Sequence, residues 1–100
     1  MKHHRRNSGN GSASVGEITN LPVRYVIDAY SESGASYLSG HLITATKGAA
    51  FLTKVFDGEP VKLLLANGEV LAILPQNAEI ASRSLTFRDA DGRIPPSLLP

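Results

Sequence analysis

Residues 61–74 read VKLLLANGEVLAIL, and this stretch decides the fold class. Two apolar runs flank Asn67-Gly68, a dipeptide that favours a two-residue type I′ turn between antiparallel strands. Such a turn pairs Leu65 with Val70 and brings alternate side chains of the two strands to one face. The predicted core face is wholly apolar and comprises Val61, Leu63, Leu65, Val70, Ala72 and Leu74.

The opposite face of this predicted hairpin mixes charged and apolar residues. It comprises Lys62, Leu64, Ala66, Glu69, Leu71 and Ile73. A strand face that is open to water usually carries polar side chains. We therefore expect this second face to be partly covered, either by a helix or by a second protomer.

Two more strands are predicted before the hairpin. Residues 23–30 alternate with a period of two, which indicates a strand. Its apolar face comprises Val23, Tyr25, Ile27 and Ala29. Residues 31–36 form a turn in which Gly34 takes a positive φ. Residues 37–45 form the next strand, with Gly40 as a candidate bulge.

One short helix is predicted over residues 48–56, where apolar residues recur at helical spacing. Thr46 is placed to cap its start, and Asp57-Gly58 ends it. At about two turns this helix is too short to be stable alone, so it must pack on the sheet.

Proline and glycine mark strand ends and turns in the rest of the chain. Pro75-Gln76-Asn77 ends the second strand of the hairpin, because proline cannot donate to a ladder. Residues 79–88 alternate loosely and predict one or two further strands. Residues 89–92 read Asp-Ala-Asp-Gly, which is a turn.

These elements divide the chain into three parts. Residues 1–19 are rich in Ser, Gly and Asn and lack apolar periodicity, so we expect a disordered basic arm. Residues 20–92 form the domain, and residues 93–100, with three prolines, form an extended tail. The predicted fold class is mostly β with one short helix, a small antiparallel β-barrel or sandwich of five to six strands.

The composition fits one small domain. The chain has 100 residues and no Cys, which excludes disulfides and thiolate metal sites. Residues 1–19 hold three basic residues and one acidic residue, a net charge of +2, whereas the remaining seven basic and eight acidic residues give −1. The folded part therefore lacks a basic stripe, and nucleic acid is not an expected partner. No apolar run follows the basic start or is long enough to span a bilayer, which favours a cytoplasmic protein without membrane contact.

The sequence offers no motif for catalysis or metal binding. His41 stands alone in a predicted strand, and His3 and His4 lie in the predicted arm. No serine lies in a Gly-x-Ser-x-Gly pattern, and no Gly-rich phosphate loop leads into a Lys-Ser/Thr pair. We therefore expect a protein without enzymatic activity, catalytic residues, a metal or a cofactor.

Several segments are similar to a family of small β-barrels. Residues 2–6 read KHHRR and resemble the Arg-x-x-x-Arg element of the PilZ family, with Lys2 in the first place and Arg6 in the last. Residues 21–25, 56–65 and 84–89 look like that family's first strand, the entry to its central hairpin and its closing strand.

The second PilZ element is Asp/Asn-x-Ser-x-x-Gly at a strand and turn, and residues 29–34 resemble it. Ser31 and Gly34 match the pattern. Ala29 stands at the acidic or amide position, and Asp28 lies one residue earlier. The loss of the Asp/Asn side chain favours, as the alternative, a degenerate barrel that no longer binds the nucleotide and contacts protein instead.

The resemblance implies a module that binds cyclic di-GMP. Guanidinium groups can fork to a phosphate or to the Hoogsteen edge of guanine. By that resemblance Arg5 and Arg6 would clamp the ligand, while Ser31 and the backbone of Gly34 would form its polar floor.

Two other functions are compatible with the same pattern. The apolar residues on both faces of the predicted hairpin favour a protein partner or a homodimer, as in an Sm-like or SH3-like barrel without nucleotide binding. RNA binding ranks third, because Tyr25 and Tyr30 point to opposite faces of their strand and do not form one stacking platform.

Overall fold

The computed structural model describes residues 2–45, 48–92 and 94–100, and in them the chain is mostly β with one short helix. The elements, in chain order, are β1 (His3–Val15), β2 (Ile18–Glu32), β3 (Ala35–Thr44), α1 (Ala49–Lys54), β4 (Val61–Leu64), β5 (Val70–Glu79), β6 (Ser84–Asp89) and the 3-10 turn η1 (Pro96–Leu98).

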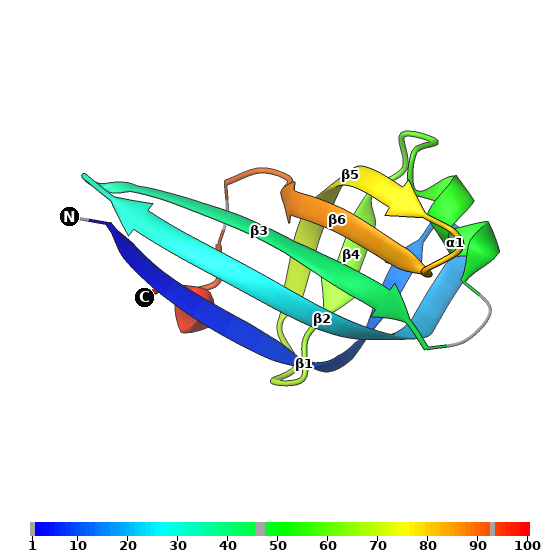
Figure 1. Ribbon diagram of the computed structural model, residues 1–100, viewed down its shortest axis with the longest axis horizontal. Coiled ribbons are helices and arrows are strands. Elements are labelled where there is room, and N and C mark those ends of the chain that lie inside the picture. Colours follow the sequence, from blue (N-terminus) through cyan, green and yellow to red (C-terminus); the bar gives the residue numbers. More distant parts are fainter. Residues whose placement is uncertain (1, 46–47, 93) are drawn as a thin grey trace.

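The strands close into an antiparallel barrel in the order β1-β2-β3-β6-β5-β4, with β4 returning to β1 (Figure 1). This confirms the predicted mostly β class and selects the barrel over the sandwich. The helix α1 lies at one end of the barrel, where Phe51 and Leu52 are buried in the core. A closed barrel leaves few strand edges open to other chains.

The prediction of a disordered arm over residues 1–19 is wrong, because residues 3–15 form β1. This strand pairs with β2 from His3 opposite Ser31 to Val15 opposite Ile18. It also closes the barrel, since Ser12 to Val15 pair with β4. The domain therefore begins well before residue 20.

The polar, glycine-rich composition of β1 has a packing cause. The ring of Tyr25 on β2 crosses beneath β1, and its hydroxyl oxygen accepts a hydrogen bond from the Ala66 backbone N–H at 2.9 Å. A Cβ at Gly9 would lie 2.9 Å from that hydroxyl, and one at Gly11 would collide with the carbonyl of Leu64. Both positions need glycine because another chain segment occupies the side-chain space.

The hairpin of residues 61–74 forms, but in a different register from the predicted one. Leu63 opposes Leu71 and Leu64 opposes Val70, and the Leu65 N–H donates to the Glu69 carbonyl at 2.8 Å. The loop thus has three residues and ends at Gly68, whose φ is +89°. Such loops combine a type I turn with a glycine bulge.

This single-residue shift reverses the faces of β5. Leu71 and Ile73 are buried beside the inward residues of β4, whereas Val70 and Leu74 point outward and are 56% and 39% exposed. The predicted core face was therefore right for Val61, Leu63 and Leu65 and wrong for the second strand. Because the side-chain period of a strand is two, any odd shift has this effect.

Other boundaries also differ from the predictions. Strand β5 continues through Pro75 to Glu79, and the irregularity between Pro75 and Asn77 is a bulge rather than a strand end. The candidate bulge at Gly40 is wrong, because that residue pairs regularly with both neighbouring strands. A Cβ at Gly40 would lie 2.5 Å from the Val26 carbonyl oxygen and 2.8 Å from the Phe87 ring, which accounts for the glycine.

The helix is shorter than predicted and has no side-chain cap at its start. The predicted capping residue, Thr46, lies outside the described residues. No helix in the described part of the chain is long and apolar enough to cross a membrane.

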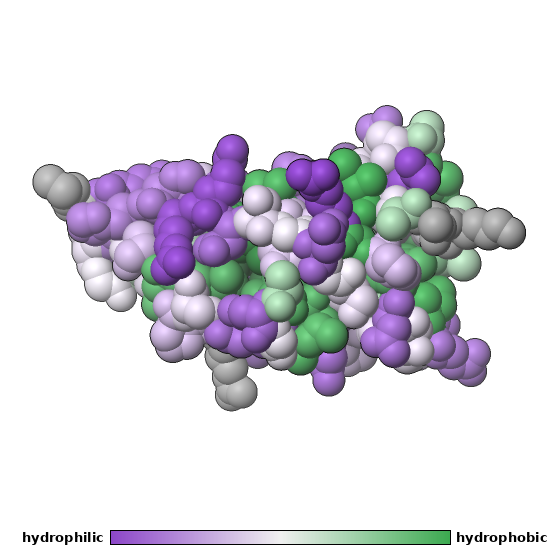
Figure 2. Space-filling model, turned by 90° about the horizontal axis from the view of Figure 1, so that it is seen from below, coloured by the Kyte–Doolittle hydropathy of each residue, from purple (hydrophilic) through white to green (hydrophobic). Residues whose placement is uncertain are grey.

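Strands β1, β2 and β3 extend past the barrel. Strand β3 pairs with β6 only from Ser39 to Ile43, and β1 pairs with β4 only from Ser12 onward. Residues 3–6, 28–32 and 35–38 therefore form a three-stranded projection, which we call the ribbon (Figure 1). It gives the molecule its 41 Å length against widths of 24 and 23 Å. In Figure 2 this end is largely hydrophilic, whereas hydrophobic residues show over the barrel.

The C-terminal tail is packed on the barrel, contrary to the predicted extended tail. Leu98, on the η1 turn, is 3% exposed and joins the core. The hydroxyl of Ser97 donates to the Glu69 carboxylate at 2.6 Å, and Arg5 donates to the Leu99 carbonyl at 3.3 Å. These contacts tie the tail to β1 and to the hairpin loop.

Replacing Leu98 with alanine should lower the free energy of unfolding by about 2–3 kcal/mol, because it leaves a cavity in the core. Urea unfolding measures the change. Leu99→Ala is the matched control, since that neighbour is only half-buried, and it should cost less than about 1 kcal/mol. Equal losses in the two variants would contradict the docked tail.

Candidate functional site

The outward-facing side chains of the ribbon form one connected group. Successive side chains of a strand point to opposite faces of the sheet. Ala29 on β2 and Leu38 on β3 are buried, so the residues before and after each of them point outward. Directly opposed residues of antiparallel strands share a face, so His4 and Arg6 on β1, which oppose Tyr30 and Asp28, also point outward. We call this group the ribbon cluster. Its members are Lys2, His4, Arg6, Asp28, Tyr30 and Tyr37.

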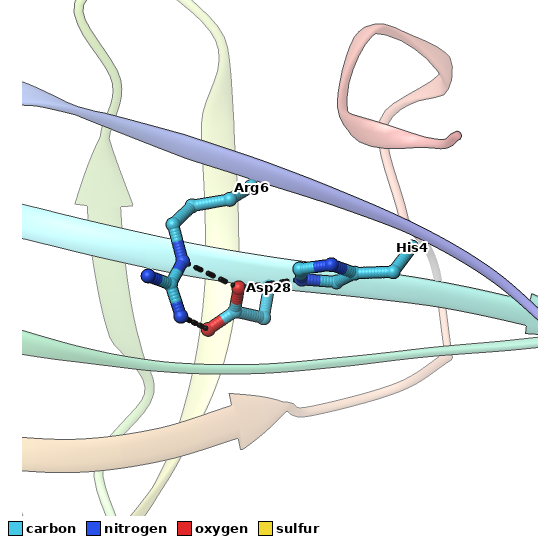
Figure 3. Close-up of polar contacts among 3 residues, drawn as sticks. All are labelled: His4, Arg6 and Asp28. Carbon is cyan, nitrogen blue, oxygen red and sulfur yellow. Dashed lines mark hydrogen bonds and ion pairs between the residues drawn. The ribbon is translucent and has the colours of Figure 1, made fainter.

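Asp28 is the polar centre of the ribbon cluster (Figure 3). The Arg6 guanidinium donates from Nε to Oδ1 at 2.8 Å and from Nη2 to Oδ2 at 3.3 Å. The Nε2 atom of His4 lies 2.7 Å from Oδ1. The Asp28 side chain is only 16% exposed, whereas that of Arg6 is 65% exposed, so the carboxylate is shielded beneath its two partners.

The hydrogen bonds from Arg6 hold the pKa of Asp28 below its ordinary value, against the opposing effect of burial and with a smaller contribution from His4. The same contact raises the pKa of Arg6. Both groups therefore stay charged at neutral pH, and the pair keeps its fork geometry.

Three rings stack across the ribbon beside this pair. His4 and Tyr30 have ring centroids 4.8 Å apart, and Tyr30 and Tyr37 have centroids 5.0 Å apart, with interplanar angles of 23° and 17°. Each ring comes from a different strand, and the three residues are opposed in the strand register. Offset stacking of this kind adds stability beyond the area that is buried.

Lys2 covers the outer side of this stack. Its ammonium group lies 4.7 Å from the Tyr30 ring centroid and 5.7 Å from that of Tyr37, within the range of a cation–π contact. A hydrogen bond with Tyr37 raises the pKa of Lys2. The ribbon cluster thus combines three basic side chains with two tyrosine rings on one face.

The structure separates the four predicted site residues. Arg6 faces outward with Asp28, but Arg5 is opposed to the buried Ala29 and therefore lies on the other face of β1. Arg5 and Arg6 do not converge on one ligand position in this geometry. Ser31 is opposed to His3, and Gly34 lies at the turn with a φ of +81°, as predicted for it.

Sequence reasoning missed the tyrosine pair, although a signal for it exists. Ser33 and Gly34 both take positive φ and form a two-residue turn. Once that turn is assigned, the register places Tyr30 opposite Tyr37. The contact of Asp28 with Arg6 carries no such signal, because it depends on residues 3–6 being a strand.

The ribbon cluster is suited to binding. It offers cationic donors and aromatic faces, while its one carboxylate is already engaged. Within the described residues, no group of three or more His, Asp or Glu side chains could hold a metal ion. Comparison with protein families, with curated proteins and with solved structures finds no match for this chain.

Asp28→Asn should destabilise the protein at neutral pH but not in strong acid. Because the folded state lowers the pKa of Asp28, its charge adds stability above the unfolded value of 3.8, and this is lost as the pH falls through the lower folded pKa. Urea unfolding of both proteins at pH 7 and pH 2 tests this. The exposed Asp57→Asn is the control, and an undiminished difference for Asp28→Asn at pH 2 would contradict the ion pair.

Proposed function

We propose that this protein is a non-enzymatic binding module that holds a nucleotide on the outer face of the ribbon, and that cyclic di-GMP is the first ligand to test. The observation that carries the proposal is the ribbon cluster, in which basic side chains surround a stack of rings on one exposed face. Phosphates and bases need these two kinds of group.

Arg6 is suited to a phosphate. Asp28 uses the Nε and Nη2 edge of the guanidinium, which leaves Nη1 without a partner among the described residues. The side chain is 65% exposed, so a phosphate can approach that remaining side. Lys2 adds a second cation nearby, held by its contacts with the tyrosines. Charge-assisted hydrogen bonds to phosphate are the strong ones.

The arrangement of the two PilZ-like segments also supports the proposal. Residues 2–6 lie beside residues 28–32 on adjacent strands, which brings the basic element next to the second element. Within that second element, Asp28 and Tyr30 share the face of Arg6, whereas Ser31 is opposed to His3 and shares the face of Arg5. The geometry favours Lys2 and Arg6 as the basic pair, in place of the pair Arg5 and Arg6, because Arg5 faces the other way.

Calorimetric titration of the full chain with cyclic di-GMP tests the proposal. Arg6→Ala should weaken binding by about tenfold or more, since it removes a charged hydrogen bond to phosphate. Arg5→Ala is the matched control, the same substitution one residue away on the opposite face, and should change affinity less than about twofold. Absence of binding to the unmodified chain, or an equal loss in both variants, would refute the proposed site.

A second candidate function rests on the outer face of the β4–β5 hairpin. Leu64 and Val70 are opposed there and are 39% and 56% exposed, and Leu74 on the same strand face is 39% exposed. Neighbouring apolar side chains on an exposed sheet face often mark a contact with another protein. We propose self-association through this face as the alternative.

Sedimentation at high protein concentration distinguishes this alternative. The unmodified chain should sediment as a dimer, and Val70→Lys should convert it to a monomer by placing charges in the contact. Ile80→Lys is the control, because Ile80 is 55% exposed but lies in the turn after β5. A monomeric unmodified chain would exclude self-association.

A further inference from the structure

The stack of rings on the ribbon has an open end. Tyr37 is its last member, and one face of its ring packs against Tyr30 at 5.0 Å. The opposite ring face points away from Tyr30, toward the edge of β3 that has no strand partner beside residues 35–38. Tyr37 is 42% exposed, and it lines a surface depression.

The strand register explains why no side chain fills the next place in the stack. Ser39 on β3 opposes Arg88 on β6, so a continued β6 would place Ala90 opposite Tyr37. Instead β6 ends at Asp89, and the Ala90 N–H donates to the Ala72 carbonyl at 3.2 Å. The chain turns toward β5 at this point and leaves the position beyond Tyr37 vacant.

A depression of about 540 Å³ occupies this position. Its lining includes Tyr37, Ser39, Gln76, Arg88 and Asp89. Binding sites for small ligands usually fall in the range of about 300–1,000 Å³ and combine apolar walls with a few polar groups.

The polar groups of the lining are of two kinds. Asp89 is fixed, since it accepts hydrogen bonds from the backbone N–H groups of Leu38 at 3.1 Å and Gly92 at 2.9 Å. Arg88 and Gln76 make no side-chain hydrogen bond or ion pair with the described residues, so their donors are available to a ligand. Gln76 lies at the bulge of β5, between the paired residues Pro75 and Asn77.

We propose that this depression binds the planar heteroaromatic ring of an anionic ligand, the base of a purine nucleotide, which stacks on Tyr37 as the fourth ring of the series. Gln76 would donate to and accept from the polar edge of the base, and Arg88 would hold the phosphate. This inference rests on the proposed nucleotide-binding function and adds a base site at the β3 edge, across the ribbon from the basic residues of β1.

Titration of the ¹⁵N-labelled full chain with guanosine 5′-monophosphate tests the base site. We expect the largest amide shifts at residues 37–39, 76 and 88–90, which surround the depression. Ribose 5-phosphate is the control that lacks the base, and it should cause small shifts near Arg88 alone. Equal shifts with both ligands, or no shifts with the nucleotide at millimolar concentration, would overturn the inference.

Three variants separate the effects of ring stacking and of the phosphate contact on binding from effects on the fold. Tyr37→Leu should weaken nucleotide binding by about tenfold or more, whereas Tyr37→Phe keeps the ring and should stay within about threefold. Arg88→Gln, on the exposed side of β6, should weaken binding by about tenfold without disturbing the amide spectrum. Retained affinity in both Tyr37→Leu and Arg88→Gln would overturn the base site.

The same variants distinguish failure of the base site from failure of the proposed function. Binding of cyclic di-GMP that depends on Arg6 but not on Tyr37 or Arg88 would remove the base site and leave the proposed function standing. Nucleotide binding that depends on Tyr37 and not on Arg6 would support the base site and move the phosphate contact away from Arg6. No binding of either nucleotide would refute both.

Discussion

The pairing of β1 with β2 on one side and with β4 on the other is the interaction on which the rest of the structure depends. It closes the barrel and buries Ala13 and Val15 in the core. It also carries Lys2, His4 and Arg6 to the outer face of the ribbon at fixed positions. Without this pairing the basic residues would be a solvated tail and Asp28 would have no partner.

The sequence predicted those features that local chemistry determines. The alternation of residues 23–30 placed Tyr25 and Ile27 in the core, and the positive φ of Gly34 followed from its turn. The mostly β class and the short helix also followed from periodicity. Features set by contacts between distant segments did not follow, and β1 is the main case. Its inward positions carry glycine and small polar residues because Tyr25 and the β4–β5 loop fill the space, so it lacks the apolar pattern of a strand.

The register of the β4–β5 hairpin, which differs from the predicted one by a single residue, is a second feature that local sequence does not determine. Asn67-Gly68 suits a two-residue loop as well as the last part of a three-residue loop, and the choice between them decides which side of β5 is buried. One contact of the candidate site could be predicted from the sequence, and another could not. The stacking of Tyr30 on Tyr37 could be deduced from the turn between them, whereas the contact of Arg6 with Asp28 could not, because it required the pairing of β1.

Amide hydrogen exchange of residues 3–11 in the full chain tests the central claim most directly. If β1 is a strand of the ribbon, the amides that bond to β2 should be protected, alternating along the chain with amides that exchange faster. Their protection should rise toward the barrel, where β4 pairs with the other edge of β1. Uniformly rapid exchange over residues 3–11, as in an unstructured peptide, would contradict the ribbon and the placement of every basic residue on it.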